Sequence, residues 1–169
     1  MSTSNLFNET LLMKTLILGL GNPILSDDGV GILVARELSK KLARFKNIDV
    51  KEASVAGLAL LDIIAGYKKL LIIDAIITKK RKPGTIYKFT PDDFKLSVRL
   101  NSLHDLNLAS VLKLGREYAH ELPEEILIYA IEVLDNRTFN DRCTPEVQKE
   151  IPCIAQYIFD EILEQFANR

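Results

Sequence analysis

The sequence predicts an α/β fold: a three-layer sandwich whose mostly parallel, mixed sheet of about five strands has helices on both faces. Two observations lead to this prediction. Short apolar runs typical of buried strands alternate along the chain with longer stretches of helical periodicity. The 169 residues, 47% of them hydrophobic, contain no internal repeat and no low-complexity segment, which favours one domain with its own core.

Residues 14–169 are expected to form this single domain, and residues 1–13 a flexible leader. The leader has no basic region followed by a long apolar run, so it does not resemble a signal peptide. No apolar stretch reaches the roughly 20 residues of a membrane helix. The net charge of −1 provides no global field toward nucleic acid or an anionic membrane. We therefore expect a cytoplasmic protein, with its two cysteines reduced, that binds neither.

The first half of the chain predicts three strands and two helices. Residues 14–20 form an apolar run typical of a strand buried on both faces, and residues 31–45 carry apolar side chains at helical spacing. Residues 47–54 alternate as a strand, and an apolar helix is expected over 56–67. Residues 69–77 are the most hydrophobic segment and predict a central strand.

The second half continues the alternation. Residues 79–84 contain a Pro-Gly turn, and residues 85–90 alternate as the second strand of a hairpin-like pair with the run before them, which makes the sheet mixed. A helix is expected over 105–119 and another buried strand over 125–133.

A helical region is predicted for residues 144–166 at the end of the chain. Pro145 suits the first turn of a helix, where its missing N–H has no partner to lose. Pro152 is expected to kink or divide the region.

The loop GLGNPILSDDGVG, residues 19–31, raises the question of which ion it holds. Its glycines resemble a dinucleotide fingerprint, but no glycine or alanine occupies the third position of that pattern. Asp27 and Asp28 occupy the helix entry, where a pyrophosphate needs unobstructed N–H groups. No Lys-Ser/Thr ending of a phosphate loop is present. The loop therefore predicts no nucleotide and favours a cation.

One of the two aspartates is explained as a helix N-cap, because aspartate is a preferred capping residue and complements the helix dipole. A single side chain suffices for a cap, so the other needs a second explanation. Our interpretation is that Asp27 supports the loop backbone while Asp28 projects into the binding crevice; the opposite assignment stays open.

Asp74 and His104 are the other candidates. Asp74 interrupts the apolar run LLIIDAII, where an ionised carboxylate costs several kcal/mol unless a cation or strong donors satisfy it. A backbone turn, a Lys or Arg partner, or a metal ion would each satisfy it. His104 begins the expected helix over 105–119, where the helix dipole disfavours the imidazolium and leaves a lone pair for a metal, although such histidines are more often structural.

The three candidates lie on segments that reach the carboxyl edge of a parallel sheet, where α/β folds bind their ligands. Asp28, Asp74 and His104 would form an oxygen- and nitrogen-donor site with open positions. Such a set suits a divalent transition metal, and the affinity order favours nickel over iron or manganese.

These segments resemble the hydrogenase maturation endopeptidases. The family pattern G-x-G-N-x-x-x-x-D-[DE]-x-x-G is matched in full at 19–31, D-A-[IVT] at 74–76, S-x-H at 102–104 and [ST]-P-E-V at 144–147. The resemblance covers about residues 14–165 in collinear order. One departure is that a Gly-x-Glu-Pro segment of the family keeps only its glutamate, Glu132, in this chain.

The resemblance implies that Asp28, Asp74 and His104 bind nickel and act in catalysis, supported by the loop residues Gly19, Gly21, Asn22, Asp27 and Gly31. The nickel arrives with the substrate, the large-subunit precursor of a nickel–iron hydrogenase, and the enzyme removes the C-terminal extension of that precursor after nickel insertion. The sequence contains no convincing nucleophile dyad, so metal-assisted hydrolysis is favoured, with nickel either catalytic or only a docking point. A monomer is expected.

Two alternatives remain. A non-catalytic maturation chaperone could use the same three residues to sense nickel insertion without cutting. The segment GLGNP also resembles the opening of peptidyl-tRNA hydrolase, an esterase that needs a histidine shortly after this motif. The next histidine here is His104, and the aspartates of the loop would repel tRNA phosphates.

Overall fold

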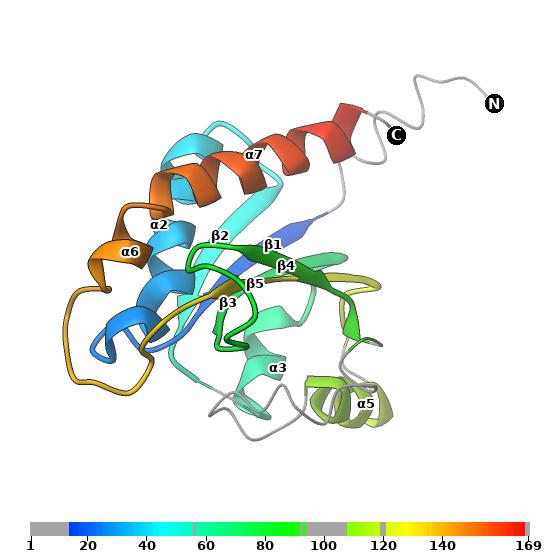
Figure 1. Cartoon of the computed structure of the whole chain (residues 1–169). Coiled ribbons are helices and arrows are strands. Elements are labelled where there is room, and N and C mark those ends of the chain that lie inside the picture. Colours follow the sequence, from blue (N-terminus) through cyan, green and yellow to red (C-terminus); the bar gives the residue numbers. More distant parts are fainter. Residues whose placement is uncertain (1–13, 56, 92, 94–107, 119–120, 168–169) are drawn as a thin grey trace.

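The computed structural model describes residues 14–55, 57–91, 93, 108–118 and 121–167. A five-stranded sheet runs through its centre in the order β2-β1-β3-β5-β4 (Figure 1). Four strands are parallel, and β4 pairs antiparallel with β5 at one edge. The strands are β1 (Thr15–Leu20), β2 (Ile48–Ala53), β3 (Lys69–Ile76), β4 (Ile86–Phe89) and β5 (Glu125–Glu132). The predicted mostly parallel, mixed sheet is confirmed.

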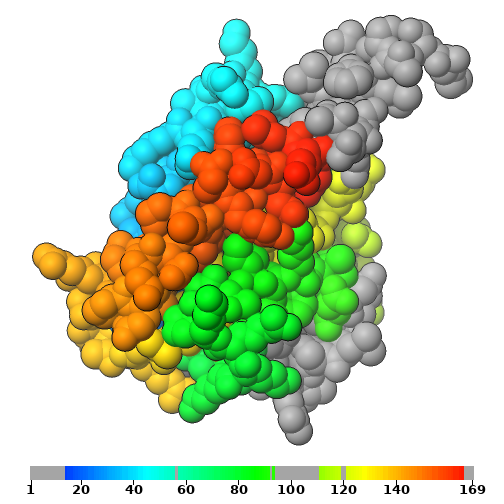
Figure 2. All heavy atoms as spheres, turned by 45° about the horizontal axis from the view of Figure 1, so that its top comes forward, coloured from blue at the N-terminus to red at the C-terminus, as the bar shows by residue number. Residues whose placement is uncertain are grey.

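Helices cover both faces of the sheet (Figure 1). Helices α2 (Val30–Leu42) and α7 (Ile151–Ala167) pack with one set of strand side chains into one apolar cluster. Helices α3 (Ala59–Ile64) and α5 (Leu108–Glu117) pack with the alternate set into a second cluster. Figure 2 shows α7 lying along α2 on the outside of the first face. The three-layer sandwich predicted from the sequence is confirmed.

The predicted hairpin between residues 69–77 and 85–90 is wrong. Strand β4 pairs with β5, which lies between it and β3. The segment that joins β3 to β4 instead crosses the end of β5. Its crossing is fixed there by two main-chain hydrogen bonds, from Gly84 N to Glu132 O and from Glu132 N to Thr85 O, both 2.8 Å. The apolar β5 thereby has a hydrogen-bonded neighbour on each side, as a central strand does.

The helix ends differ from the predicted ranges in ways the chain explains. A 3₁₀ turn, η1 (Ser26–Gly29), precedes α2, which ends at Leu42 rather than at residue 45. The C-terminal region divides into α6 (Pro145–Gln148) and α7. Pro145 is the first residue of α6, and Pro152 is the second of α7, where a missing N–H costs little. The predicted division is confirmed.

Parallel pairing brings the carboxyl ends of β1, β3 and β5 to the same edge of the sheet. The loops that follow these strands line that edge, which is where α/β folds place their ligand sites. Within the described ranges, no helix is both long and apolar enough to cross a membrane.

Candidate active site

The glycines of the loop between β1 and α2 allow unusually close packing. A Cβ atom on Gly31 would lie 2.3 Å from the carbonyl oxygens of both Leu20 and Ile73, and one on Gly19 would lie 2.5 Å from the carbonyl oxygen of Gly31. No other residue fits at such distances. The first turn of α2 therefore lies directly against the ends of β1 and β3, and η1 is held at the carboxyl edge of the sheet.

Gly21 turns the chain back over this edge. It has φ +138°, and a Cβ there would lie 1.9 Å from the carbonyl oxygen of Asp28. The turn brings the N–H of Asn22 to donate to Asp28 Oδ2 at 2.7 Å, while Asn22 Oδ1 accepts from the N–H of Ile24 at 3.2 Å. The side chain of Asp28 is thus oriented by the backbone of its own loop, and the residue is 5% exposed.

Asp27 points elsewhere and is fully buried. Its Oδ2 accepts from the main-chain N–H of Leu134 (3.1 Å) and of Asp135 (3.0 Å), and its Oδ1 accepts from the N–H of Thr144 (2.6 Å). The hydroxyl of Thr144 donates to both carboxylate oxygens at 3.0 Å. Asp27 therefore ties the loop after β1 to the loop after β5 and to the start of α6.

Neither aspartate caps helix α2, so that sequence interpretation is wrong. The N-cap position of α2 is Gly29, and no side chain hydrogen-bonds there. Both aspartates lie one turn earlier, in η1, because the loop needs the extra turn to fold back over Gly21. The contacts of Asp27 agree with a role in supporting the loop backbone.

Asp74 is the sixth residue of β3 and is partly exposed. Its Oδ1 accepts from the N–H of Ala75 at 2.8 Å. Leu70 and Ile72 belong to the cluster on the α3 and α5 face, so strand alternation places Asp74 on that same face, beyond the last core side chain. The carboxylate stands where the strand emerges from the core, which lowers the desolvation cost that its sequence context suggested.

His104 lies outside the described residues, so only two of the three predicted ligands are placed. Those two, Asp28 and Asp74, lie at the same edge of the sheet, since η1 packs against β3. Among the residues that the structure describes, no three His, Cys, Asp or Glu side chains are grouped closely enough for a metal ion.

Glu132 is a buried carboxylate whose role the sequence analysis missed. At 2% exposure, its Oε1 accepts from the N–H of Thr78 (2.8 Å) and of Lys79 (3.0 Å). Its Oε2 accepts from the hydroxyl of Tyr87 at 2.8 Å and from that of Thr78. Burial alone would raise the pKa of Glu132, but the four donated hydrogen bonds outweigh it and lower the pKa. Glu132 thereby fixes the turn after β3, on the same face of the sheet as Asp74.

The only sequence signal for Glu132 was its position as the retained glutamate of the Gly-x-Glu-Pro segment, at the end of an apolar strand. A single acidic residue there also fits a strand end that meets solvent, so the sequence could not reveal the hydrogen-bond network.

Large apolar side chains are exposed on the two loops that Asp27 joins. Ile24 is 54% exposed, Leu134 51% and Phe139 81%. Two main-chain hydrogen bonds join the loops, from Asn140 N to Ile24 O (3.1 Å) and from Ser26 N to Asn140 O (2.9 Å). Exposed apolar side chains that lie on neighbouring loops are typical of protein-binding surfaces.

Comparisons with known proteins agree with this architecture. A family model for the HycI hydrogenase maturation proteases matches residues 32–161, a range that begins just after the aspartate loop and includes Asp74. The Hydrogenase 2 maturation protease of Escherichia coli is 30% identical over 120 residues, covering 70% of this chain and 73% of that protein.

Solved structures give the same result. The hydrogenase maturating endopeptidase HybD from E. coli has a TM-score of 0.72 and 26% identity, with 90% of this chain and 94% of that one covered. The [NiFe] hydrogenase maturation protease HybD from Thermococcus kodakarensis has a TM-score of 0.71 and 28% identity, covering 88% and 98%. The fold, the matched range and the identity agree with the resemblance found in the sequence: the chain belongs to the hydrogenase maturation protease family.

Proposed function

We propose that this protease removes the C-terminal extension from the large-subunit precursor of a nickel–iron hydrogenase after nickel insertion. Family membership supports the reaction class, and the names of the relatives support the substrate class. The observation that carries the proposal is the placement of Asp28 and Asp74 at one edge of the sheet, Asp28 in the turn that follows β1 and Asp74 near the end of the neighbouring parallel strand β3. His104 is the proposed third ligand.

In the proposed reaction, the nickel ion is part of the substrate. Asp28, Asp74 and His104 bind it and so place the scissile peptide at the carboxyl edge of the sheet. Water then attacks the carbonyl carbon of that peptide, the C–N bond breaks, and the leaving amine takes a proton. Three ligands without a thiolate make a modest site, so the purified protein is expected to hold little metal of its own.

The precursor is proposed to dock on the exposed apolar side chains beside this edge, namely Ile24, Leu134 and Phe139. These belong to the two loops that Asp27 holds together, so the docking surface and Asp28 keep a fixed relation. The remaining features that we propose are a cytoplasmic location, a monomeric state and no binding of nucleic acid.

Mass spectrometry of nickel-loaded precursor incubated with the protein tests the proposal. We expect the precursor to lose the mass of one C-terminal peptide, and Asp74→Asn or His104→Ala to abolish that loss while circular dichroism stays unchanged. Asp62→Asn is the matched control, because Asp62 is an exposed carboxylate on α3. A stable complex with no loss of mass would favour the chaperone alternative, and normal trimming by either site variant would remove that residue from the site.

A further inference from the structure

The outer edge of β2 carries main-chain groups that the sheet does not use. Asn47 O accepts from Thr15 N at 2.9 Å and Ala53 O accepts from Gly21 N at 3.3 Å, so the odd-numbered residues of this segment direct their backbone toward β1. Backbone direction alternates along a strand, so the N–H and C=O groups of Val50 and Glu52 point away from the sheet. In the described part of the chain, β2 pairs with no strand on that side.

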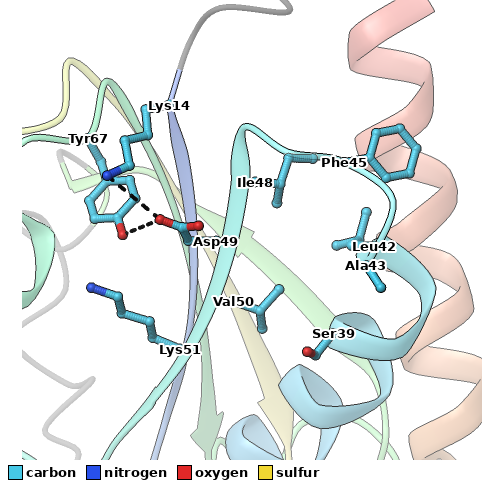
Figure 3. Close-up of a pocket in the computed structure, with 10 residues that line it drawn as sticks. All are labelled: Lys14, Ser39, Leu42, Ala43, Phe45, Ile48, Asp49, Val50, Lys51 and Tyr67. Atoms are coloured by element: carbon cyan, nitrogen blue, oxygen red, sulfur yellow. Dashed lines mark hydrogen bonds and ion pairs between the residues drawn. The ribbon is translucent and has the colours of Figure 1, made fainter.

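A shallow hollow of about 520 Å³ lies along this edge and extends to both sides of β2 (Figure 3). One side is apolar. Ile48 and Val50 of β2 point there, toward Leu42, Ala43 and Phe45 at the end of α2 and in the turn after it. Side chains of an added strand that pointed to this side would meet an apolar surface.

The other side of the hollow is polar and carries more positive than negative charge (Figure 3). The hydroxyl of Tyr67 donates to Asp49 Oδ2 at 2.6 Å, and Lys14 Nζ lies 3.8 Å from the same carboxylate oxygen. The ammonium groups of Lys14 and Lys51 lie 4.7 and 5.2 Å from the centroid of the Tyr67 ring. Asp49 is thus already engaged, whereas Lys51 is exposed and forms no ion pair with a carboxylate of the described residues.

A further acidic group near the edge is also neutralised. Glu52 accepts from Arg36 through both carboxylate oxygens, at 3.0 Å from Nε and 2.9 Å from Nη2. The edge therefore offers main-chain groups that no described strand pairs with. It also has an apolar side and a cationic side, in the alternation that a β-strand requires.

We propose that the outer edge of β2 binds an extended segment of a partner protein in which apolar and acidic residues alternate. The segment pairs its backbone with Val50 and Glu52, as in other cases of strand addition. Its apolar side chains lie against Phe45 and Val50, which are partly exposed, and its acidic side chains face Lys51. Lys14 precedes β1 and Tyr67 precedes β3, so the hollow lies toward the amino ends of these strands, away from the candidate active site. The segment would thus tether a partner without occupying that site.

A six-residue peptide, acetyl-Val-Glu-Val-Glu-Val-Glu-amide, tests this proposal by titration into the full-length protein. Heteronuclear NMR is expected to show the largest amide shifts at Val50 and Glu52. Lys51→Glu is expected to weaken binding about tenfold, since it replaces an attraction by a repulsion of similar size. Lys113→Glu on α5 is the matched control and is expected to leave binding unchanged, because Lys113 is an exposed lysine that does not line the hollow.

Two altered peptides separate strand addition from simple charge attraction. In the first altered peptide, the backbone amides that would face β2 are N-methylated. This peptide is expected not to bind, because it cannot form the main-chain hydrogen bonds of the ladder. Equal binding of that peptide, or of one with lysine in place of glutamate, would overturn the proposal. Concentration-dependent dimerisation in light scattering that Val50→Pro abolishes would overturn it too, because the edge would then pair with a second copy of the chain.

Discussion

Two buried carboxylates, Asp27 and Glu132, hold the segments on the two sides of the candidate active site, and they differ in where their hydrogen-bond partners come from. Asp27 lies in a loop and reaches across to Leu134, Asp135 and Thr144, which come much later in the chain. Glu132 lies at the end of a strand and reaches out to a neighbouring turn at Thr78 and Lys79. The first carboxylate joins its own loop to the loop after β5 and the start of α6, whereas the second joins the turn after β3 and the strand β4 to the end of β5.

This difference bears on what keeps the candidate active site rigid. The loop that carries Asp28 depends on a carboxylate whose partners lie 107 to 117 residues away, in loops and at a helix start. The segment near Asp74 depends on a carboxylate whose partners, 45 to 54 residues away, belong to a strand and a turn that the sheet already places beside it. Loss of Asp27 should therefore disturb more of the structure than loss of Glu132.

The largest effect is expected for Asp27→Ala. The variant leaves the three main-chain N–H groups of Leu134, Asp135 and Thr144 without their carboxylate acceptor, which should lower the free energy of unfolding by about 3 kcal/mol. Urea unfolding monitored by circular dichroism measures the change, with Asp62→Ala as the control. A loss of unfolding free energy no larger than that of Glu132→Gln would contradict the greater structural role given to Asp27.

Gly31→Ala tests the close packing of α2 against the ends of β1 and β3, beneath the loop that carries Asp27 and Asp28. Its Cβ would lie 2.3 Å from two carbonyl oxygens, so α2 must shift, and we expect a loss of about 2–3 kcal/mol. Gly66→Ala is the matched variant, because Gly66 has φ +79° with no atom within 4 Å of an added Cβ; backbone strain alone should cost it about 1 kcal/mol. Equal losses in thermal unfolding would argue against the close packing.

Glu132→Gln should cost about 1–2 kcal/mol at pH 7, because an amide nitrogen then faces hydrogen-bond donors. The pKa of Glu132 is lowered in the folded protein, so its carboxylate stabilises the fold fully above its ordinary pKa of about 4.3. That stabilisation is lost as the pH falls through the lowered pKa. Urea unfolding of both proteins between pH 7 and pH 3 should show the difference shrinking below about pH 4; a constant difference would contradict the assignment.

The smallest effect concerns a thiol beside Asp27. Cys143 is buried and donates to the carbonyl oxygen of Ser26 at 3.7 Å. Burial, together with the charge of Asp27, raises the pKa of Cys143 to about 12, whereas Cys153 is exposed. Iodoacetamide at pH 8 followed by peptide mapping should modify Cys153 far faster than Cys143. In Asp27→Ala, Cys143 should react faster than in the unaltered protein. Similar rates of modification of Cys143 and Cys153 in the unaltered protein would show that solvent reaches Cys143.

The sequence predicted most of the architecture because the strands carry strong signals. Residues 69–76 are apolar almost throughout, as a central strand requires, and the glycine and aspartate spacing of 19–31 is specific enough to indicate a tight loop at a strand end. The strand that pairs with residues 86–89 could not be predicted, because alternation of apolar and polar residues indicates a strand but not its neighbour in the sheet. Proximity along the chain favoured β3, and the structure pairs the run with β5.

The candidate site was predicted in part. The position of Asp74 at a strand end followed from the apolar residues around it. Separate roles for Asp27 and Asp28 were an interpretation from the sequence, but the partners of Asp27 could not be predicted, because they come from segments more than 100 residues away. The network of Glu132 was missed for the same reason, since Thr78 and Tyr87 approach it only through the sheet order.

The most direct test of the account compares Asp28→Asn with Asp28→Glu in single-turnover trimming of nickel-loaded precursor. Asn keeps the size of the side chain but removes its charge, whereas Glu keeps the charge. We predict that Asp28→Asn slows trimming at least about 100-fold, since even residues that only support a metal ligand contribute 10–100-fold, and that Asp28→Glu retains activity. Trimming by Asp28→Asn at the unaltered rate would contradict the proposed nickel-binding role of this carboxylate.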